Sequence, residues 1–211
     1  MKKLYRFNKN KKFVLFDYET CGLNLASLDN KPWQLAFLVA DQNQIFEKKD
    51  FYIKWEKLNI SDEAKKITGF KEDKYLSKAV DPSVVLNEVE KFFYDSEFDV
   101  VGHNILGFDI YIHNIHRILC NKKPDYSYLD RSIDTNSLAK AKSMGIDLNG
   151  ENFFFWQSKL QKIRKKGLKT SLKYLCKHYQ VDSDESKLHD ALYDITKNYE
   201  VFKKLIWDFE F

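Results

Sequence analysis

The sequence predicts an α/β fold in which helices flank a mixed sheet. Three strand-like runs, rich in aromatic and aliphatic residues, come first, at residues 12–18, 34–41 and 44–54. Beyond them, helical patterns alternate with short apolar strands, which is typical of a layered α/β architecture. We expect a single domain over residues 1–211, with a basic lead-in at 1–11, because a hydrophobic content of 44% suffices for one sizeable core.

The first elements have clear boundary signals. The turn-prone residues 41–44, DQNQ, separate the second and third strands and predict a hairpin. Ser61 is a favourable N-cap for a short helix over 61–68. Another helix begins where Asp81 serves as N-cap and Pro82 takes the first helical position, because apolar residues then recur at helical spacing.

The second half alternates strand and helix. The sequence DVVGHN, residues 99–104, predicts a brief buried strand. The remaining expected elements are a helix at 109–120, a strand that ends at Asp134, a helix up to residue 144, and helices near 170–179 and 189–206. Residues 145–165 have no decisive pattern.

Positive charge is concentrated in one segment. Residues 152–181 contain eight Lys or Arg and no Asp or Glu, whereas the whole chain has a net charge of +4. The segment also contains the aromatic residues 153–156, FFFW. Lysines interleaved with aromatic rings suit a phosphate backbone with stackable bases. A solvated lysine-rich face is the alternative interpretation.

We expect an intracellular, cytoplasmic protein without a membrane segment. The longest apolar run, residues 35–40, is too short to cross a bilayer, and the basic start lacks a signal-peptide pattern. Cys21, Cys120 and Cys176 lie far apart and form no CxxC pair. Reduced thiols are therefore expected, rather than disulfides or a thiolate zinc site.

The first strand ends with two carboxylates. In FVLFDYETCGL, residues 13–23, Asp17 and Glu19 are two positions apart, so in a strand they project from the same face. Two adjacent carboxylates repel each other and are costly to bury unless a cation lies between them. Oxygen ligands select hard ions such as magnesium or manganese. Solvated acids paired with lysines are the alternative, and this motif alone favours it.

Further acids follow in two other segments. VGHNILGFDIYI places Asn104 and Asp109 between a strand and a helix. HDALYDI places His189 five residues before Asp194, at the start of the last helix. Asp190, four residues before Asp194, either approaches a metal or stabilises the helix N-terminus, and we prefer the second interpretation.

Together these motifs resemble the DEDD superfamily of 3′→5′ exonucleases, in its histidine-containing, DnaQ-like branch. The three family motifs are matched by Asp17, Glu19, Thr20 and Gly22, by Asn104, Phe108 and Asp109, and by His189 and Asp194. Residues 63–70, 133–140 and 172–181 resemble other family segments. The three-residue gap in the second motif is similar to that of exonuclease I and of family B polymerase exonuclease domains.

The resemblance implies a ribonuclease H-like fold with a five-stranded mixed sheet. It also implies two divalent cations, Mg²⁺ or Mn²⁺, held by Asp17, Glu19, Asp109 and Asp194, with His189 accepting the proton of the attacking water. In a regular helix His189 and Asp194 would lie about 140° apart. We therefore expect His189 in a looser turn before the helix.

Several residues are expected to contact the substrate. By resemblance, Thr20 and Gly22 meet the terminal nucleotide, and Leu23 is either an apolar wedge against its base or part of the core. Asn104 is expected near the second-motif carboxylate, and His103 is expected to be a hydrogen-bonded strand-end histidine. The basic side chains that would guide phosphates are Lys159, Lys162, Arg164, Lys165, Lys166 and Lys169.

These observations predict a metal-dependent 3′→5′ exonuclease that acts on single-stranded nucleic acid, with DNA favoured over RNA. It would release nucleoside 5′-monophosphates from the 3′ end. One alternative is a proofreading or RNA-processing nuclease that acts with a polymerase or repair partner. The other is a nucleic-acid-binding module that has lost catalysis. The sequence does not predict the oligomeric state.

Overall fold

A computed structural model describes residues 5–209, and Lys2 and Lys3 of the predicted basic lead-in lie outside them. The strands are β1 Lys12–Thr20, β2 Pro32–Ala40, β3 Ile45–Ile53, β4 Ala79–Val80, β5 Phe98–Gly102 and β6 Ser132–Asp134. The α-helices are α1 Asp62–Thr68, α2 Glu72–Lys78, α3 Pro82–Phe93, α4 Asp109–Leu119, α5 Thr135–Met144, α6 Phe153–Lys162, α7 Leu172–His178 and α8 Ala191–Leu205. The 3₁₀ turns are η1 Tyr5–Phe7, η2 Ile105–Gly107, η3 Leu129–Arg131, η4 Glu185–Lys187 and η5 Ile206–Asp208.

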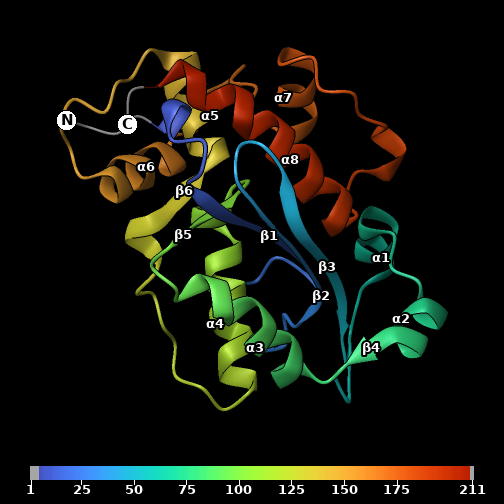
Figure 1. Ribbon diagram of the computed structural model, residues 1–211. Coiled ribbons are helices and arrows are strands. Elements are labelled where there is room, and N and C mark those ends of the chain that lie inside the picture. The colour runs from blue at the N-terminus through green and yellow to red at the C-terminus, as the bar shows by residue number, and fades with distance from the viewer. Residues whose placement is uncertain (1–4, 210–211) are drawn as a thin grey trace.

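The strands form one mixed sheet in the order β4-β3-β2-β1-β5-β6 (Figure 1). The first three strands are antiparallel to one another, whereas β5 runs parallel to β1 and β6 runs parallel to β5. The sequence predicted five strands, and the sheet has six, so that prediction is wrong by one strand. The sixth is β4, whose two residues pair in parallel with the end of β3, and two residues are too short to give a periodic signal in the sequence.

Helices cover both faces of the sheet, and β1 lies between two cores. Phe13 and Leu15 point toward α8, where the Phe13 and Phe202 ring centroids are 5.0 Å apart. Phe16 points toward α3 and α4, with its ring centroid 4.7 Å from that of Phe93. Figure 1 shows β1 in the middle of this arrangement. The strict alternation along β1 decides which side chains reach each layer.

The boundary signals in the sequence are confirmed by hydrogen bonds. In the hairpin between β2 and β3 the Asp41 amide donates to the Gln44 carbonyl at 3.0 Å. The Ser61 hydroxyl accepts from the third residue of α1, and the Asp81 carboxylate accepts from two amides at the start of α3. Pro82 is the first residue of α3, as predicted.

Two helices were not predicted: α2, and α6 in the segment without a decisive pattern. Trp156 in α6 is 2% exposed, and Phe153 and Phe154 pack against the core. Trp156 therefore cannot stack on a base, because its ring is covered, whereas Phe155 is exposed. No helix within residues 5–209 is long and apolar enough to cross a membrane.

Candidate active site

The end of β1 presents two acids on one face and a buried tyrosine on the other. Asp17 and Glu19 are partly buried, whereas Tyr18 is 4% exposed. The Tyr18 hydroxyl lies 3.1 Å from His113 Nδ1 and 3.3 Å from His116 Nδ1, both in α4. Because α4 holds the tyrosine side chain, the alternation of the strand leaves both carboxylates on the opposite face.

The third carboxylate, Asp109, is the first residue of α4. It is 3% exposed, and its Oδ1 accepts a 3.0 Å hydrogen bond from the backbone N–H of Tyr18. Burial raises the pKa of Asp109 to about 7, although the Tyr18 amide opposes that shift. A single peptide group of β1, between the first two acids, therefore positions the third.

The fourth carboxylate, Asp194, lies in the first turn of α8. Asp190 is the N-cap of that helix, and its side chain accepts from the Tyr193 amide, so the predicted helix-stabilising role of Asp190 is confirmed. Asp194 Oδ2 accepts from the His189 amide at 3.1 Å, whereas Oδ1 is buried without a hydrogen-bond partner. Burial raises the pKa of Asp194 to about 6.

His189 lies before α8, in the turn where the sequence placed it. Its backbone φ is +69°, a left-handed conformation that is uncommon for a residue with a side chain. The side chain is exposed. Residues held in such conformations cluster at functional sites, where the surrounding structure maintains them.

The four acids act on one another electrostatically. Burial raises the pKa of Asp17 well above its ordinary value, and the charges of Asp109, Glu19 and Asp194 raise it further. Burial, followed by the charges of Asp194 and Asp109, raises the pKa of Glu19 to about 9. Carboxylates from β1, α4 and α8 therefore lie near enough for their charges to act on one another, and such a group of acids favours a bound positive charge.

Cation binding requires a further adjustment of these side chains. Among residues 5–209, no three His, Cys, Asp or Glu side chains stand close enough together to hold an ion as they are. Carboxylates without a counter-charge repel one another, which keeps them apart. The donor set nevertheless fits a hard divalent cation, because it consists of oxygen atoms and includes the unpartnered Asp194 Oδ1.

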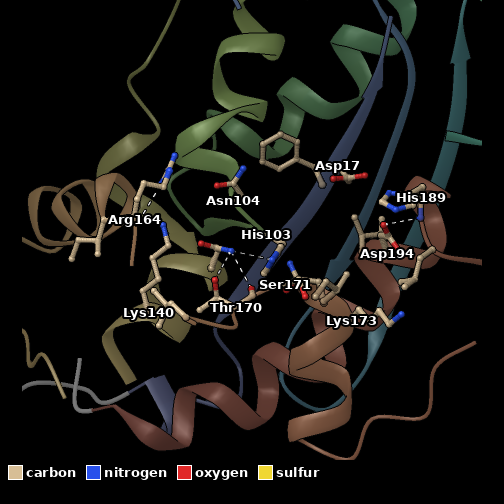
Figure 2. A pocket seen from close by; sticks show the side chains of 18 of the residues that line it. Asp17, His103, Asn104, Lys140, Arg164, Thr170, Ser171, Lys173, His189 and Asp194 are labelled. Carbon is tan, nitrogen blue, oxygen red and sulfur yellow. Dashed lines mark hydrogen bonds between the residues drawn. The ribbon is translucent and has the colours of Figure 1, made fainter. Parts of the chain in front are cut away.

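A cavity of about 670 Å³ contains part of this site. Asp17, Asp194 and His189 line one end, and Lys165 lines it as well, whereas Glu19 and Asp109 are not among its lining residues. Figure 2 shows Asp17 on β1 facing the His189–Asp194 pair, with the amide hydrogen bond between those two drawn as a dashed line. Asn104 projects from the loop after β5 into the same cavity.

Asp134, at the end of β6, is a positioning residue that the sequence did not single out. Its side chain is 0% exposed and accepts backbone hydrogen bonds from Asn104 at 3.1 Å and from Leu106 at 3.0 Å. It also accepts from Asn136 and Ser137 in the first turn of α5. The segment that leads to α4 is therefore held by a residue 30 positions away in sequence from Asn104.

The predicted structural role of His103 is confirmed. Its Nδ1 lies 3.0 Å from Thr135 Oγ1 and its Nε2 lies 3.3 Å from Asn136 Nδ2. Burial lowers the pKa of His103 to about 4. Both ring nitrogens have partners, so the ring connects β5 to α5.

Comparison with known proteins identifies the family. The profile of the exonuclease family matches residues 14–202. This chain belongs to that exonuclease family. Its DnaQ-like motifs, which have a histidine as the fifth site residue, agree with the match. The chain is also 27% identical over 194 residues to the PolC-type DNA polymerase III of Ureaplasma parvum serovar 3, a match that covers 92% of this chain and 11% of the polymerase.

Solved structures share the fold of this exonuclease-family chain. The zinc-bound complex of E. coli ExoI with single-stranded DNA has a TM-score of 0.71 at 20% identity, over 92% of this chain and 40% of that one. E. coli exonuclease I in complex with a dT13 oligonucleotide has a TM-score of 0.71 at 19% identity, over 92% and 41%. This likeness establishes the ribonuclease H-like fold. The chain thus spans less than half the length of these relatives.

The residues predicted to contact the substrate differ from one another in exposure and in hydrogen bonding. Leu23 is 85% exposed, so the core alternative for it is wrong. The Thr20 hydroxyl donates to the Gly22 carbonyl at 2.6 Å, and the Gly22 amide donates to Asn30 at 2.8 Å, so both polar groups have internal partners. The backbone N–H of Asn104 donates to Asp134 Oδ1 at 3.1 Å, and the role of its side chain near the second-motif carboxylate stays a prediction.

Two of the lysines that were expected to guide phosphates, Lys165 and Lys166, differ in position. Lys165 and Lys166 are both exposed, in the segment between α6 and α7. Lys165 lines the cavity that contains Asp17, whereas Lys166 does not. Earlier in the same basic segment, Lys159 forms an ion pair with Glu151 at 2.5 Å. A high local density of lysine in the sequence therefore does not give every lysine the same access to the site.

Proposed function

We propose that the chain is a metal-dependent 3′→5′ exonuclease that hydrolyses single-stranded nucleic acid, with DNA favoured over RNA, and releases nucleoside 5′-monophosphates. The main support is the convergence of four carboxylates from three elements beside an exposed histidine, in a chain of the exonuclease family. The preference for DNA is supported by the Asn104-to-Phe108 spacing, which resembles that of exonuclease I.

The acids would form the cation site. The residues that would hold two divalent cations, Mg²⁺ or Mn²⁺, are Asp17, Glu19, Asp109 and Asp194. When bound, the cations supply activation of water and stabilisation of charge on the leaving oxygen. The Tyr18 amide orients Asp109, and the His189 amide holds one oxygen of Asp194 so that the other faces the site. These two backbone donors hold one oxygen each of Asp109 and Asp194.

His189 would act as the general base. As the water oxygen bonds to the terminal phosphorus, the imidazole takes the proton, and the bond between phosphorus and the 3′ oxygen of the preceding nucleotide breaks. That oxygen leaves with a proton from solvent. A positioned base contributes about 10²- to 10⁴-fold. The exposed side chain of His189 leaves its ring accessible to a bound strand.

The terminal nucleotide would lie near the turn after β1. Leu23, which is exposed, would cover the base with its apolar side chain. The Thr20–Gly22 hydrogen bond shapes that turn, so the proposed role of these two residues is to hold the backbone rather than to donate to the substrate. Lys165 and Lys166 would attract phosphates without reading sequence.

The direct test uses 5′-labelled single-stranded DNA and RNA of matched sequence. The purified protein is incubated with Mg²⁺ or Mn²⁺, then with chelator, with Asp17→Asn as the inactive control. Stepwise shortening from the 3′ end that disappears with chelator and with Asp17→Asn supports the proposal. Binding without cleavage would instead support a binding module.

A second candidate is a proofreading or processing nuclease that acts with a partner. Its support is the similarity to a PolC-type DNA polymerase III, of which the chain covers 11%. If activity on single strands is weak for the isolated protein and rises when a polymerase is added, this candidate is preferred. Equal rates with and without the polymerase favour independent action.

A further inference from the structure

A second cavity, of about 760 Å³, opens on the other side of the Leu188–His189 segment. Its walls are the end of α1 with the start of α2, part of β3, and η4 with the first turns of α8. Leu188 and His189 line both cavities, so the second cavity adjoins the proposed active site. Its lining contains six lysines, and we call it the lysine groove: Lys48, Lys66, Lys71, Lys74, Lys187 and Lys197.

Four of the six groove lysines form no ion pair within residues 5–209. Two of the lysines have acidic partners, since Lys187 lies 3.5 Å from Asp184 and Lys197 lies 3.3 Å from Glu200. The four without a carboxylate within 4.0 Å, among residues 5–209, are Lys48, Lys66, Lys71 and Lys74. Asp190 is the acidic residue of the lining, and its carboxylate is already hydrogen-bonded to the Tyr193 amide at 3.0 Å.

The groove also offers surfaces for bases. Tyr193 lines it, with Lys197 Nζ 5.6 Å from the centre of its ring. Ile67, which also lines the groove, is 54% exposed. Concentrated lysines bordered by an aromatic ring and an exposed aliphatic side chain match the requirements of a single strand, whose phosphates need cations and whose bases need flat or apolar contacts.

We propose that the lysine groove binds the sugar–phosphate backbone of the nucleic acid strand whose 3′ end lies in the active site. This inference rests on the proposed function. A polyanion in the groove would pass directly beside His189, because that residue borders both cavities. This continuity is the reason to favour a nucleic acid over an acidic protein. Lysine contacts of this kind supply affinity and position without sequence preference.

The groove is distinct from the basic segment at 152–181. That segment contributes Lys165 to the first cavity, which contains Asp17, and contributes no residue to the groove. The unpaired groove lysines belong to β3, to α1 and to the start of α2. The strand would therefore meet cations on both sides of the Leu188–His189 segment, and the groove lysines would matter only for strands long enough to reach them.

The test measures binding in chelator, so that cleavage is not required. The variant is Lys66→Gln with Lys71→Gln, and the control is Lys57→Gln with Lys123→Gln, which removes the same charge from exposed lysines outside both cavities and outside the basic segment at 152–181. The probe is a labelled oligothymidylate of about 12 nucleotides, long enough for a typical single-strand site. Anisotropy titrations at several salt concentrations give the dissociation constant and its salt dependence.

The groove variant is expected to bind about tenfold more weakly in low salt and to lose about 1.4 from the slope of log affinity against log salt, at about 0.7 for each lost phosphate contact. The control should match the parent. A groove variant with the parent's affinity and slope overturns the inference. If the parent binds in a groove-dependent way but does not shorten the strand with Mg²⁺, the proposed function fails and the groove stands.

Discussion

Asp134→Asn tests how the fold holds the segment that leads to Asp109. The buried Asp134 carboxylate accepts four backbone hydrogen bonds at 2.9 to 3.1 Å, of which Oδ2 accepts the one from Leu106. Asparagine has the same shape, but its NH₂ group would replace the Oδ2 that accepts from the Leu106 N–H. Two donors would then face each other, and that hydrogen bond would be lost. Losing one bond to a charged group costs about 1.5–3 kcal/mol, and a buried unpaired N–H adds about 1–3 kcal/mol. We expect the free energy of unfolding to fall by about 3 kcal/mol, or about 6–12 °C in Tm for a domain of this size.

Urea denaturation followed by circular dichroism measures that loss, and the rate of DNA shortening measures its effect on the site. The matched control is Asp99→Asn. Asp99 is 3% exposed, pairs with Lys11 at 3.1 Å, and lies beside Phe13 near the start of β1. Both variants should lose stability, but only Asp134→Asn should lose activity per folded molecule. A change of less than about 0.5 kcal/mol for Asp134→Asn would refute the reasoning, because that is the range of ordinary surface substitutions.

Three further predictions concern charge and protonation. Asp17→Asn should stabilise the metal-free protein by about 1–3 kcal/mol at pH 8, because it removes a buried charge that neighbouring acids repel and one pKa unit is worth about 1.4 kcal/mol. The same variant should abolish the rise in Tm that Mn²⁺ causes in the parent. That gain should shrink as the pH falls from 8 toward about 4, the ordinary pKa of an aspartate, because Asp17, whose pKa is raised in the folded protein, becomes protonated there before it does in the unfolded chain. His189→Asn should lower the single-turnover rate by about 10²- to 10⁴-fold with little change in Tm, because asparagine tolerates the positive φ. Burial lowers the pKa of His116 to about 4 and also lowers the pKa of His113, so stability should be complete above about pH 6.5 and should fall as the pH drops below that value.

Each of these predictions has an opposing outcome. A metal-free Asp17→Asn protein that is less stable than the parent at pH 8 would show that the acids do not repel one another. An unchanged rate for His189→Asn would exclude the imidazole as the base. Chemical denaturation between pH 7 and pH 4.5 tests the buried histidines, and a His116→Gln variant with the parent's full acid sensitivity would remove His116 as a cause.

The local placement of the acids on their elements was predictable from the sequence because it depends on local geometry, whereas their grouping in one site was implied by the family resemblance. Strand alternation places Asp17 and Glu19 on one face, and the start of a helix places Asp109 at its N-terminus. The short motif around Asp194 also predicted that His189 lies in a turn before the last helix and that Asp190 stabilises the end of that helix. Each of these inferences needs only a few neighbouring residues.

Other features were not predictable, because they depend on contacts between distant segments. Two of the four hydrogen bonds of Asp134, those from Asn104 and Leu106, connect the end of β6 to the loop after β5, and no spacing in the sequence indicates them. The strand β4 has two residues, too few for a pattern. The lysine groove draws its cations from four separate parts of the chain, whereas the visible basic run at 152–181 includes a helix whose Trp156 is buried.

The pairing of β1 with β2 has a consequence for folding. Asp17 lies opposite Ala36, with Tyr18 beside Leu35 in the core. If β1 slid by one residue, Asp17 and Glu19 would exchange places with Tyr18 and enter the apolar layer beneath α3 and α4. An uncompensated ion there costs several kcal/mol. The acids thus penalise misaligned pairing of the central strand, so residues placed for chemistry also help the nascent sheet to select its native alignment.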